Sequence, residues 1–185
     1  MQTSGGGRMK SVLISIQPKW VEKIVNGEKT IEVRKTAPKC ETPFKCYIYM
    51  TQGKLKDLGI YSEWVYKNRM KVIGEFICDK ASELDYVYYW NNGYEFETCL
   101  TYRQVADYGK GKTLYGWHIS DLKIYDRPRE LSDFYRECEN PCKPNKGKIL
   151  CITTKSLKMN GCNGKIPLTR APQSWQYIED LGEEE

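Results

Sequence analysis

The segment from Lys10 to Lys35 constrains the fold more than any other part of the chain. Lys10 to Ile16 is rich in β-branched residues and indicates a buried strand. Pro18 then begins a short helix, because proline is tolerated in a first turn and apolar residues follow at helical spacing. Asn26 and Gly27 end this helix, since glycine is the usual residue just past a helix C-terminus. Lys29 to Lys35 returns as a strand, so the chain opens on a strand–helix–strand unit.

Short strands separated by glycine and proline continue through the rest of the chain. The segment 79–99 is expected to be an irregular, Tyr-rich insertion, and Arg127-Pro128 to end a long strand. Further elements are expected as strands over 45–50, 71–78, 114–125 and 174–178, a helix over 101–108 and a helical turn over 131–137. Five or six strands with short helices indicate an α+β protein, built as a small, partly closed β-barrel.

The chain divides into one domain with additions at both ends. Residues 1–8 are small and polar and are expected to be a disordered leader or an expression-tag remnant, with Met9 as a natural start. Residues 9–126 would form the barrel. Residues 127–185 would be a Cys-rich C-terminal extension that packs on the barrel and ends in the acidic tail 179–185.

Charge and cysteine content indicate the partner and the compartment. The net charge is +5, but the acidic tail holds five acidic groups, and the remaining chain sets 29 basic against 19 acidic residues. A basic body with 14 Tyr and 5 Trp suits RNA, although an ordinary lysine excess on a solvated surface stays open. No apolar run is long enough to span a bilayer and no secretory signal is visible, so we expect a cytoplasmic protein, and its eight cysteines as thiols or metal ligands.

The second strand of the opening unit carries the most informative charges. Side chains alternate between the faces of a strand, so Ile31 and Val33 share one face while Glu32 and Arg34 share the other. The Cα atoms of Glu32 and Arg34 would lie roughly 6–7 Å apart on an open face. Lys29 at the strand entrance could reach either face. Such a group could hold a polar ligand, or it could be a charged pair on a solvated strand.

The motif Gly27-x-Lys29-x-x-Glu32-x-Arg34, preceded by Ser15-Ile-Gln-Pro18, resembles the signature of ASCH domains, relatives of the PUA fold. The segment 115–122 resembles the closing barrel strand of that family, and 170–175 resembles an end segment of phage-type ASCH proteins. The resemblance implies a PUA-like barrel with a basic cleft beside the first helix that binds RNA or a modified nucleoside. The residues that would line this cleft are Ser15, Gln17, Lys19, Lys29, Glu32 and Arg34.

The same resemblance leaves an enzymatic alternative. Some small ASCH proteins resemble amidohydrolases of acetylated cytidine, which use a lysine, a threonine nucleophile three residues later and a distant glutamate. Here Lys29 matches, but Glu32 stands at the threonine position. Thr30 is adjacent to Lys29 but would point the other way, and the distant glutamate would be Glu75. A carboxylate is a poor substitute for a hydroxyl nucleophile in amide cleavage. Lys29 and Glu32 would be the catalytic pair of a hydrolase or a ribonuclease, and binding alone is the favoured function.

Other features leave further alternatives. A protein-interaction module would use the segment 79–99 as its exposed surface. His118, the single histidine, is favoured as a hydrogen-bonded barrel residue over an acid or base near the cleft. The basic loops Lys110-Gly-Lys112 and 143–148 would either touch phosphates or be solvated. No phosphate-binding P-loop, dinucleotide fingerprint or serine-hydrolase elbow is present, and we expect a monomer that requires no cofactor.

A structural zinc is the one metal that the sequence suggests. Cys138, Cys142, Cys151 and Cys162 could bind it tetrahedrally and order a Gly- and Lys-rich stretch, although no CxxC pair occurs and scattered thiols are the alternative. If the four thiolates form one site, purified protein should carry close to one equivalent of zinc by metal analysis. Less than about half an equivalent would contradict the site.

Overall fold

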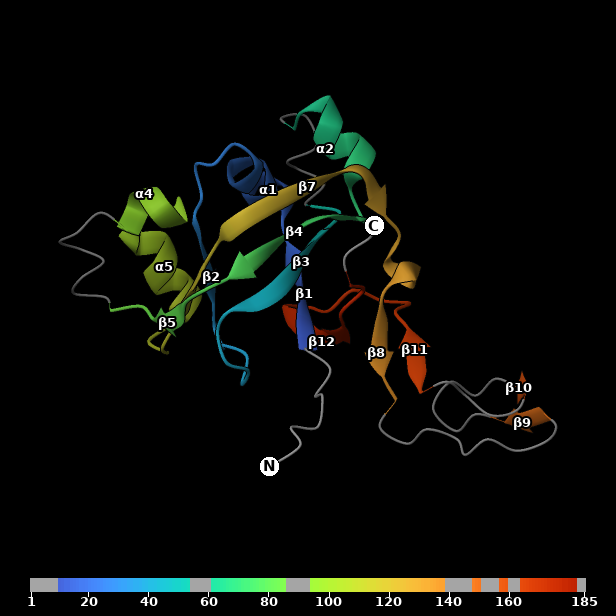
Figure 1. Cartoon of the computed structure of the whole chain (residues 1–185). Helices are drawn as coiled ribbons and strands as arrows, with labels where there is room; N and C mark the ends of the chain where they lie inside the picture. Colours follow the sequence, from blue (N-terminus) through green and yellow to red (C-terminus); the bar gives the residue numbers. More distant parts are fainter. Residues whose placement is uncertain are drawn as a thin grey trace.

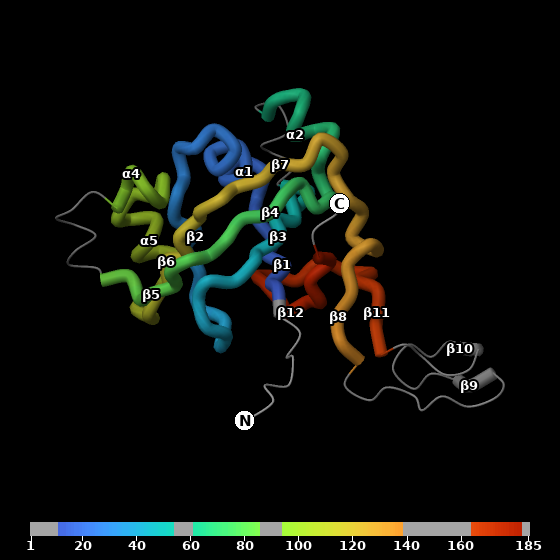
Figure 2. Tube along the Cα trace, in the orientation of Figure 1, coloured from blue at the N-terminus to red at the C-terminus, as the bar shows by residue number. Residues whose placement is uncertain are grey.

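The main sheet brings together strands from the beginning, middle and end of the chain. A computed structural model describes residues 10–53, 61–85, 94–138, 148–150, 157–159 and 164–182. In the five-stranded sheet, β1 pairs in parallel with β3 and antiparallel with β12, so the first and last strands lie side by side (Figure 2). The order of this sheet is β12 (Trp175–Glu179), β1 (Lys10–Ile16), β3 (Phe44–Met50), β4 (Val72–Cys78) and β7 (Ser120–Arg129).

A second sheet lies across one end of the first and carries the charged strand of the opening unit. Its order is β2 (Ile31–Arg34), β6 (Tyr115–His118) and β5 (Ala81–Glu83). Among the described residues, the two remaining sheets are two-stranded ladders. They pair β8 (Tyr135–Glu137) with β11 (Lys165–Pro167), and β9 (Lys148–Leu150) with β10 (Leu157–Met159).

The helices are short and lie at the rim of the sheets (Figure 1). The pair α4 and α5 lies beside β2, and the α5 N-terminus is closed by a capping box between Thr101 and Gln104. The helices are α1 (Pro18–Val25), α2 (Glu63–Asn68), α4 (Tyr94–Thr98), α5 (Tyr102–Gly109) and the 3-10 turn η2 (Leu131–Asp133). No helix in these described parts is long and apolar enough to cross a membrane.

The mixed α+β class is confirmed, whereas a closed barrel is not. The hydrogen-bonded ladders of the described strands form separate sheets, and none of these sheets closes on itself. The two larger sheets still share a core, because Trp117 of β6 packs in one cluster with Ile14 of β1, Ile48 of β3 and Phe76 of β4. The sheets therefore wrap a common interior without forming one continuous ladder.

The five-stranded sheet is buried on both faces, as the alternation along β3 shows. Cys46, Ile48 and Met50 point into the main core. Tyr47 and Tyr49 point to the opposite face, where they pack in a second cluster under the C-terminal part of the chain. Strand periodicity thus gave the two faces of β3 correctly.

Two expectations about the long strand near residue 120 were wrong. Ile119 interrupts the strand predicted over 114–125, so that β6 and β7 belong to different sheets. β7 also continues past Pro128 to Arg129, because it is the edge strand of its sheet and an edge strand tolerates a residue without an N–H donor. Gly74 lets β7 approach β4 closely, since a Cβ atom there would lie 2.4 Å from the Lys123 carbonyl oxygen.

The chain beyond residue 126 contributes to the main sheet itself. β7 crosses the predicted boundary at 126, and β12 adds a strand beside β1. The segment predicted as a helical turn over 131–137 is a turn, η2, followed by the strand β8. The division into a barrel and an extension stays a prediction.

Candidate functional site

The corner between β1 and α1 forms one edge of the site. Ser15 is held in place because its Oγ donates to the Pro172 carbonyl oxygen at 2.6 Å and its N–H donates to the Ser174 carbonyl oxygen at 2.9 Å. Gln17 is the N-cap residue of α1, and its side chain makes no capping hydrogen bond. Gln17 and Lys19 are exposed at this corner. Together they leave polar side chains at the rim and a fixed backbone below.

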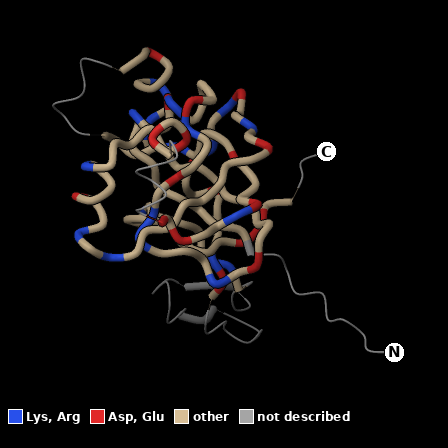
Figure 3. The backbone as a smooth tube through the Cα atoms, turned by 90° about the vertical axis from the view of Figure 1, so that its left-hand side faces the viewer, with Lys and Arg blue, Asp and Glu red and all other residues tan. Residues whose placement is uncertain are grey.

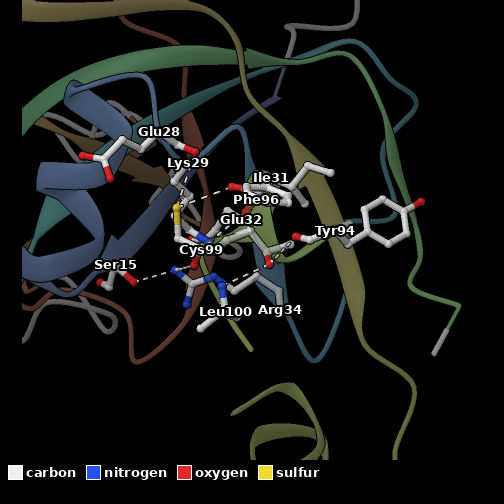
Figure 4. A network of polar contacts seen from close by, with 11 residues as sticks. Ser15, Glu28, Lys29, Ile31, Glu32, Arg34, Tyr94, Phe96, Cys99 and Leu100 are labelled. Carbon is white, nitrogen blue, oxygen red and sulfur yellow. Dashed lines mark hydrogen bonds and ion pairs between the residues drawn. The ribbon is translucent and has the colours of Figure 1, made fainter. Parts of the chain in front are cut away.

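Lys29 is buried directly behind this corner, with 2% of its surface exposed. α1 ends as predicted, with Gly27 at a φ of 73°. The Lys29 ammonium donates to the carbonyl oxygens of Ile31 at 2.8 Å and Thr98 at 2.7 Å, and it lies 3.4 Å from Glu32 Oε2 (Figure 4). Burial lowers the pKa of Lys29 from its usual value, while the charge of Glu32 opposes that shift. All three N–H directions of the ammonium therefore face protein groups.

Glu32 and Arg34 complete a buried row of alternating charge. Arg34 Nη2 lies 3.1 Å from Glu32 Oε1 and donates to the Ser15 carbonyl oxygen at 2.7 Å. Glu32 and Arg34 do share a face of β2, but the prediction that this face is open was wrong, because their exposed fractions are only 6% and 7%. The helical segment 94–109 provides much of the cover, tied to this region by the bond from Lys29 to Thr98 and by one from the Thr30 N–H to the Glu97 carbonyl oxygen at 2.9 Å.

Two polar atoms of this row lack a hydrogen bond within the described part of the chain. They are Glu32 Oε2, an acceptor, and Arg34 Nε, a donor. Glu32 Oε2 is close to the Lys29 ammonium, yet the contact is an ion pair rather than a hydrogen bond. A buried polar atom without a hydrogen bond is costly, by about 1–3 kcal/mol, so a ligand that pairs with both atoms would recover part of that cost.

A pocket of about 480 Å³ lies over the row. It brings together all six residues predicted to line the cleft, although the binding role of these residues stays a prediction. The other lining residues come from α1, β2, α5 and loops, and include the rings of Trp20 and Tyr108. The full lining is Ser15, Gln17, Lys19, Trp20, Lys29, Glu32, Val33, Arg34, Thr51, Leu100, Gln104, Tyr108 and Gln173.

Sequence reasoning missed the aromatic and amide walls of this pocket. Trp20 is visible in the sequence as part of an apolar helical stripe, but that pattern does not separate a core residue from a pocket wall. Gln104 and Tyr108 reach the pocket only because α5 packs against β2. Lysines lie over both rings: Lys19 Nζ is 4.2 Å from the centre of the Trp20 ring, and Lys35 Nζ is 4.8 Å from that of Tyr108.

Glu75, the candidate distant glutamate of a hydrolase, does not line this pocket. It lies with Tyr47 on the other face of the main sheet and lines a second cavity of about 630 Å³. Its carboxylate accepts a hydrogen bond from the Tyr125 hydroxyl at 2.5 Å. Glu75 is therefore not placed to act with Lys29.

His118 and the basic loop also lie away from the pocket lining. His118 Nδ1 is 2.6 Å from Asp79 Oδ1, so the histidine is hydrogen-bonded as favoured, but 43% of its side chain is exposed. Lys110 and Lys112 are exposed, and 143–147 lies outside the described residues. Basic and acidic positions are mixed along the tube in Figure 3 rather than gathered on one side.

The zinc and interaction-surface predictions fall largely outside the described chain. Cys138 is buried, while Cys142, Cys151 and Cys162 lie outside the described residues. Within those residues no group of three or more metal-ligating side chains is present. The Tyr-rich segment 79–99 is described at both ends but not over 86–93. Both proposals stay predictions.

Comparison with known proteins finds similar solved structures. No protein-family model and no curated protein sequence matches the chain. Among solved structures, the chain is similar to the ASCH protein of Zymomonas mobilis, with 25% identity over 66% of this chain and 74% of that one, and a TM-score of 0.51. A serine-to-alanine variant of that protein gives 25% identity over 67% and 76%, with a TM-score of 0.51. A tyrosine-to-phenylalanine variant gives 24% identity over 66% and 76%, with a TM-score of 0.50.

These neighbours fit a mixed α+β domain of the PUA-like class, in agreement with the two sheets that share one core. The strand–helix–strand unit that carries the Lys29, Glu32 and Arg34 motif contributes β1 to the five-stranded sheet and β2 to the three-stranded sheet. The likeness to these ASCH structures supports an ASCH-domain protein.

The buried row of Lys29, Glu32 and Arg34 predicts that one isosteric substitution will strongly lower the stability of the protein. Glu32→Gln leaves the buried cations Lys29 and Arg34 without their shared counter-charge, and it should lower the free energy of unfolding by about 3–5 kcal/mol. Urea unfolding followed by circular dichroism measures this loss.

Glu28→Gln is the matched control, since Glu28 pairs with Lys23 at 2.7 Å on the surface, where both side chains are well exposed. The control should lose little stability because solvent screens the pair. Equal losses for the two variants would contradict a structural role for the buried row.

Proposed function

We propose that the pocket over Lys29, Glu32 and Arg34 binds RNA or a modified nucleoside by recognising the polar edge of a base. The observation that carries this proposal is that Glu32 and Arg34 both line the pocket, and that each keeps one buried polar atom, the acceptor Glu32 Oε2 and the donor Arg34 Nε, without a hydrogen-bond partner among the described residues. The polar edges of nucleobases combine donors and acceptors, and single-stranded RNA exposes these edges. A base that entered the pocket could therefore pair with the Glu32 carboxylate and the Arg34 guanidinium, the two charged groups of β2 that line it.

The shape and walls of the pocket support a ligand of this size. Its volume of about 480 Å³ falls within the range of about 300–1,000 Å³ that is usual for small-molecule sites. Trp20 and Tyr108 offer aromatic surfaces on which a base can stack. Lys19, exposed at the rim, supplies a cation for a phosphate.

The environment of Lys29 favours binding over hydrolysis. A general base needs a lone pair, and a nucleophile needs an unobstructed approach to the substrate. The Lys29 ammonium instead donates to two backbone carbonyl oxygens and forms an ion pair with Glu32. Its role is then to hold Glu32 and the segment around Thr98 in place, as a positioning residue of the site.

The wider expectations from the sequence belong to the same proposal. We propose a cytoplasmic monomer that needs no cofactor for binding. A structural zinc on the C-terminal cysteines is a separate prediction. The similarity to ASCH structures is consistent in general with RNA or nucleoside interaction. We still expect the two larger sheets to form a partly closed barrel.

A thermal-shift screen with nucleosides, modified nucleosides and short RNAs tests the proposal. A ligand at a hundredfold excess over its Kd stabilises the folded state by about 2.7 kcal/mol, which in a chain of this size raises Tm by about 5–10 °C. Arg34→Lys keeps the buried charge but removes the Nε donor, so it should abolish most of that rise.

Arg69→Lys is the matched control, because Arg69 also has an Nε atom without a hydrogen bond but does not line the pocket. It should keep the full shift. If no nucleoside or RNA raises Tm, or if both variants respond alike, the pocket does not bind as proposed.

The hydrolase alternative makes a separate prediction. Incubation with acetylated cytidine and with RNA, followed by chromatography of the products, should show no turnover, because the Lys29 donors are engaged and Glu75 lies in the other cavity. Turnover that disappears in Lys29→Met but persists in Lys67→Met, an exposed lysine outside the pocket, would establish the enzyme instead.

A further inference from the structure

The edge strand β7 carries a row of cations that has no part in the pocket described above. Lys123, Tyr125, Arg127 and Arg129 occupy every second position of β7 from Lys123 to its end, and all four line the second cavity of about 630 Å³. These four residues are called the β7 stripe. β7 ends the hydrogen-bonded order of the main sheet, so the stripe lies at a sheet edge. The second cavity shares no lining residue with the first pocket.

Two cations of the stripe are available to a partner. Lys123 and Arg127 are exposed, and neither makes a hydrogen bond or an ion pair with another residue in the described parts of the chain. The Arg129 guanidinium lies 5.3 Å from the centre of the Tyr125 ring. This stacking holds the Arg129 side chain against the strand.

The acidic groups near the stripe are mostly engaged by other residues. Glu75 accepts from the Tyr125 hydroxyl at 2.5 Å, and Asp180 accepts from the Tyr47 hydroxyl at 2.6 Å. A single ammonium, that of Lys45, lies 3.9 Å from Glu75 and 3.5 Å from Asp180.

Two further acidic residues, Asp126 and Glu130, lie next to residues of the stripe in the sequence. Glu130 pairs with Lys71 at 3.0 Å. Asp126 is exposed and is the acidic lining residue with no hydrogen bond or ion pair within the described parts of the chain. Among the described lining residues, Lys123 and Arg127 outnumber Asp126, so the net unpaired charge is positive.

We propose that the β7 stripe is a second binding surface, which contacts the phosphates of single-stranded RNA. Lys123, Arg127 and Arg129 lie along one edge strand, whose pairing with β4 is irregular between Ile124 and Arg129. The cations therefore form a series that can follow a flexible, charged backbone. Contacts of this kind position a strand without reading its sequence. The inference rests on the proposed function only in taking RNA as the partner, since the stripe needs no base in the first pocket.

The salt dependence of binding to oligouridine measures the stripe directly. A labelled oligouridine of about 20 nucleotides exceeds the single-stranded site sizes of about 4–16 nucleotides, and fluorescence anisotropy gives its Kd across salt concentrations. Each phosphate contact to a single strand contributes about −0.7 to the slope of log K against log salt. The double variant Lys123→Gln/Arg127→Gln should therefore have a slope smaller in magnitude by about 1.4.

Lys39→Gln/Lys67→Gln removes the same charge from exposed positions that line neither cavity, and should leave the slope unchanged. Equal slopes for the two double variants, or no oligouridine binding by the unaltered chain at low salt, would overturn the proposal. The first pocket is tested separately, by the nucleoside-induced rise in Tm. That rise should be the same in Lys123→Gln/Arg127→Gln as in the unaltered chain, so either proposal can fail while the other stands.

Discussion

The buried row of Lys29, Glu32 and Arg34 is the constraint on which the site depends. Each charge in it needs a partner because desolvation is costly, and the partners come from separate parts of the chain: the Ser15 carbonyl at the end of β1 and the Thr98 carbonyl at the end of α4. The row thus fixes where β1, β2 and the helical segment 94–109 meet. That meeting point is the pocket, so the same interactions that hold the fold together also shape the site.

Local sequence patterns predicted the elements of this arrangement well. The strand–helix–strand unit, the helix end at Gly27 and the two faces of β3 all follow from backbone preferences and side-chain periodicity, which act over a few residues. The helix expected over 101–108 is α5, and its capping box is likewise local. The predicted lining residues were found together because a motif of eight residues, Gly27 to Arg34, carries half of them.

The remainder depends on contacts between distant segments, which periodicity does not report. A strand with alternating charge looks the same in sequence whether its polar face meets solvent or a helical cover, so the burial of Glu32 and Arg34 could not be predicted. Two further features depend on the strand order of the complete sheet, which only the whole fold defines. They are the pairing of β12 with β1 and the continuation of β7 past Pro128. Glu75 shows the same limit, since its position in β4 is predictable but the cavity it faces is not.

The distribution of charge separates two tasks that net charge alone would merge. In the first pocket, two cations share one carboxylate and backbone carbonyls, so the charges are largely compensated inside the protein. Such a site selects a ligand by hydrogen bonds and stacking, with little dependence on salt. The unpaired cations on β7 face solvent, where attraction to phosphates is strong but carries no sequence information. If the chain binds RNA, selectivity arises in the first pocket, where the charges nearly cancel, and electrostatic affinity arises on the exposed edge strand β7. The excess of basic residues therefore gives no guide to where recognition takes place.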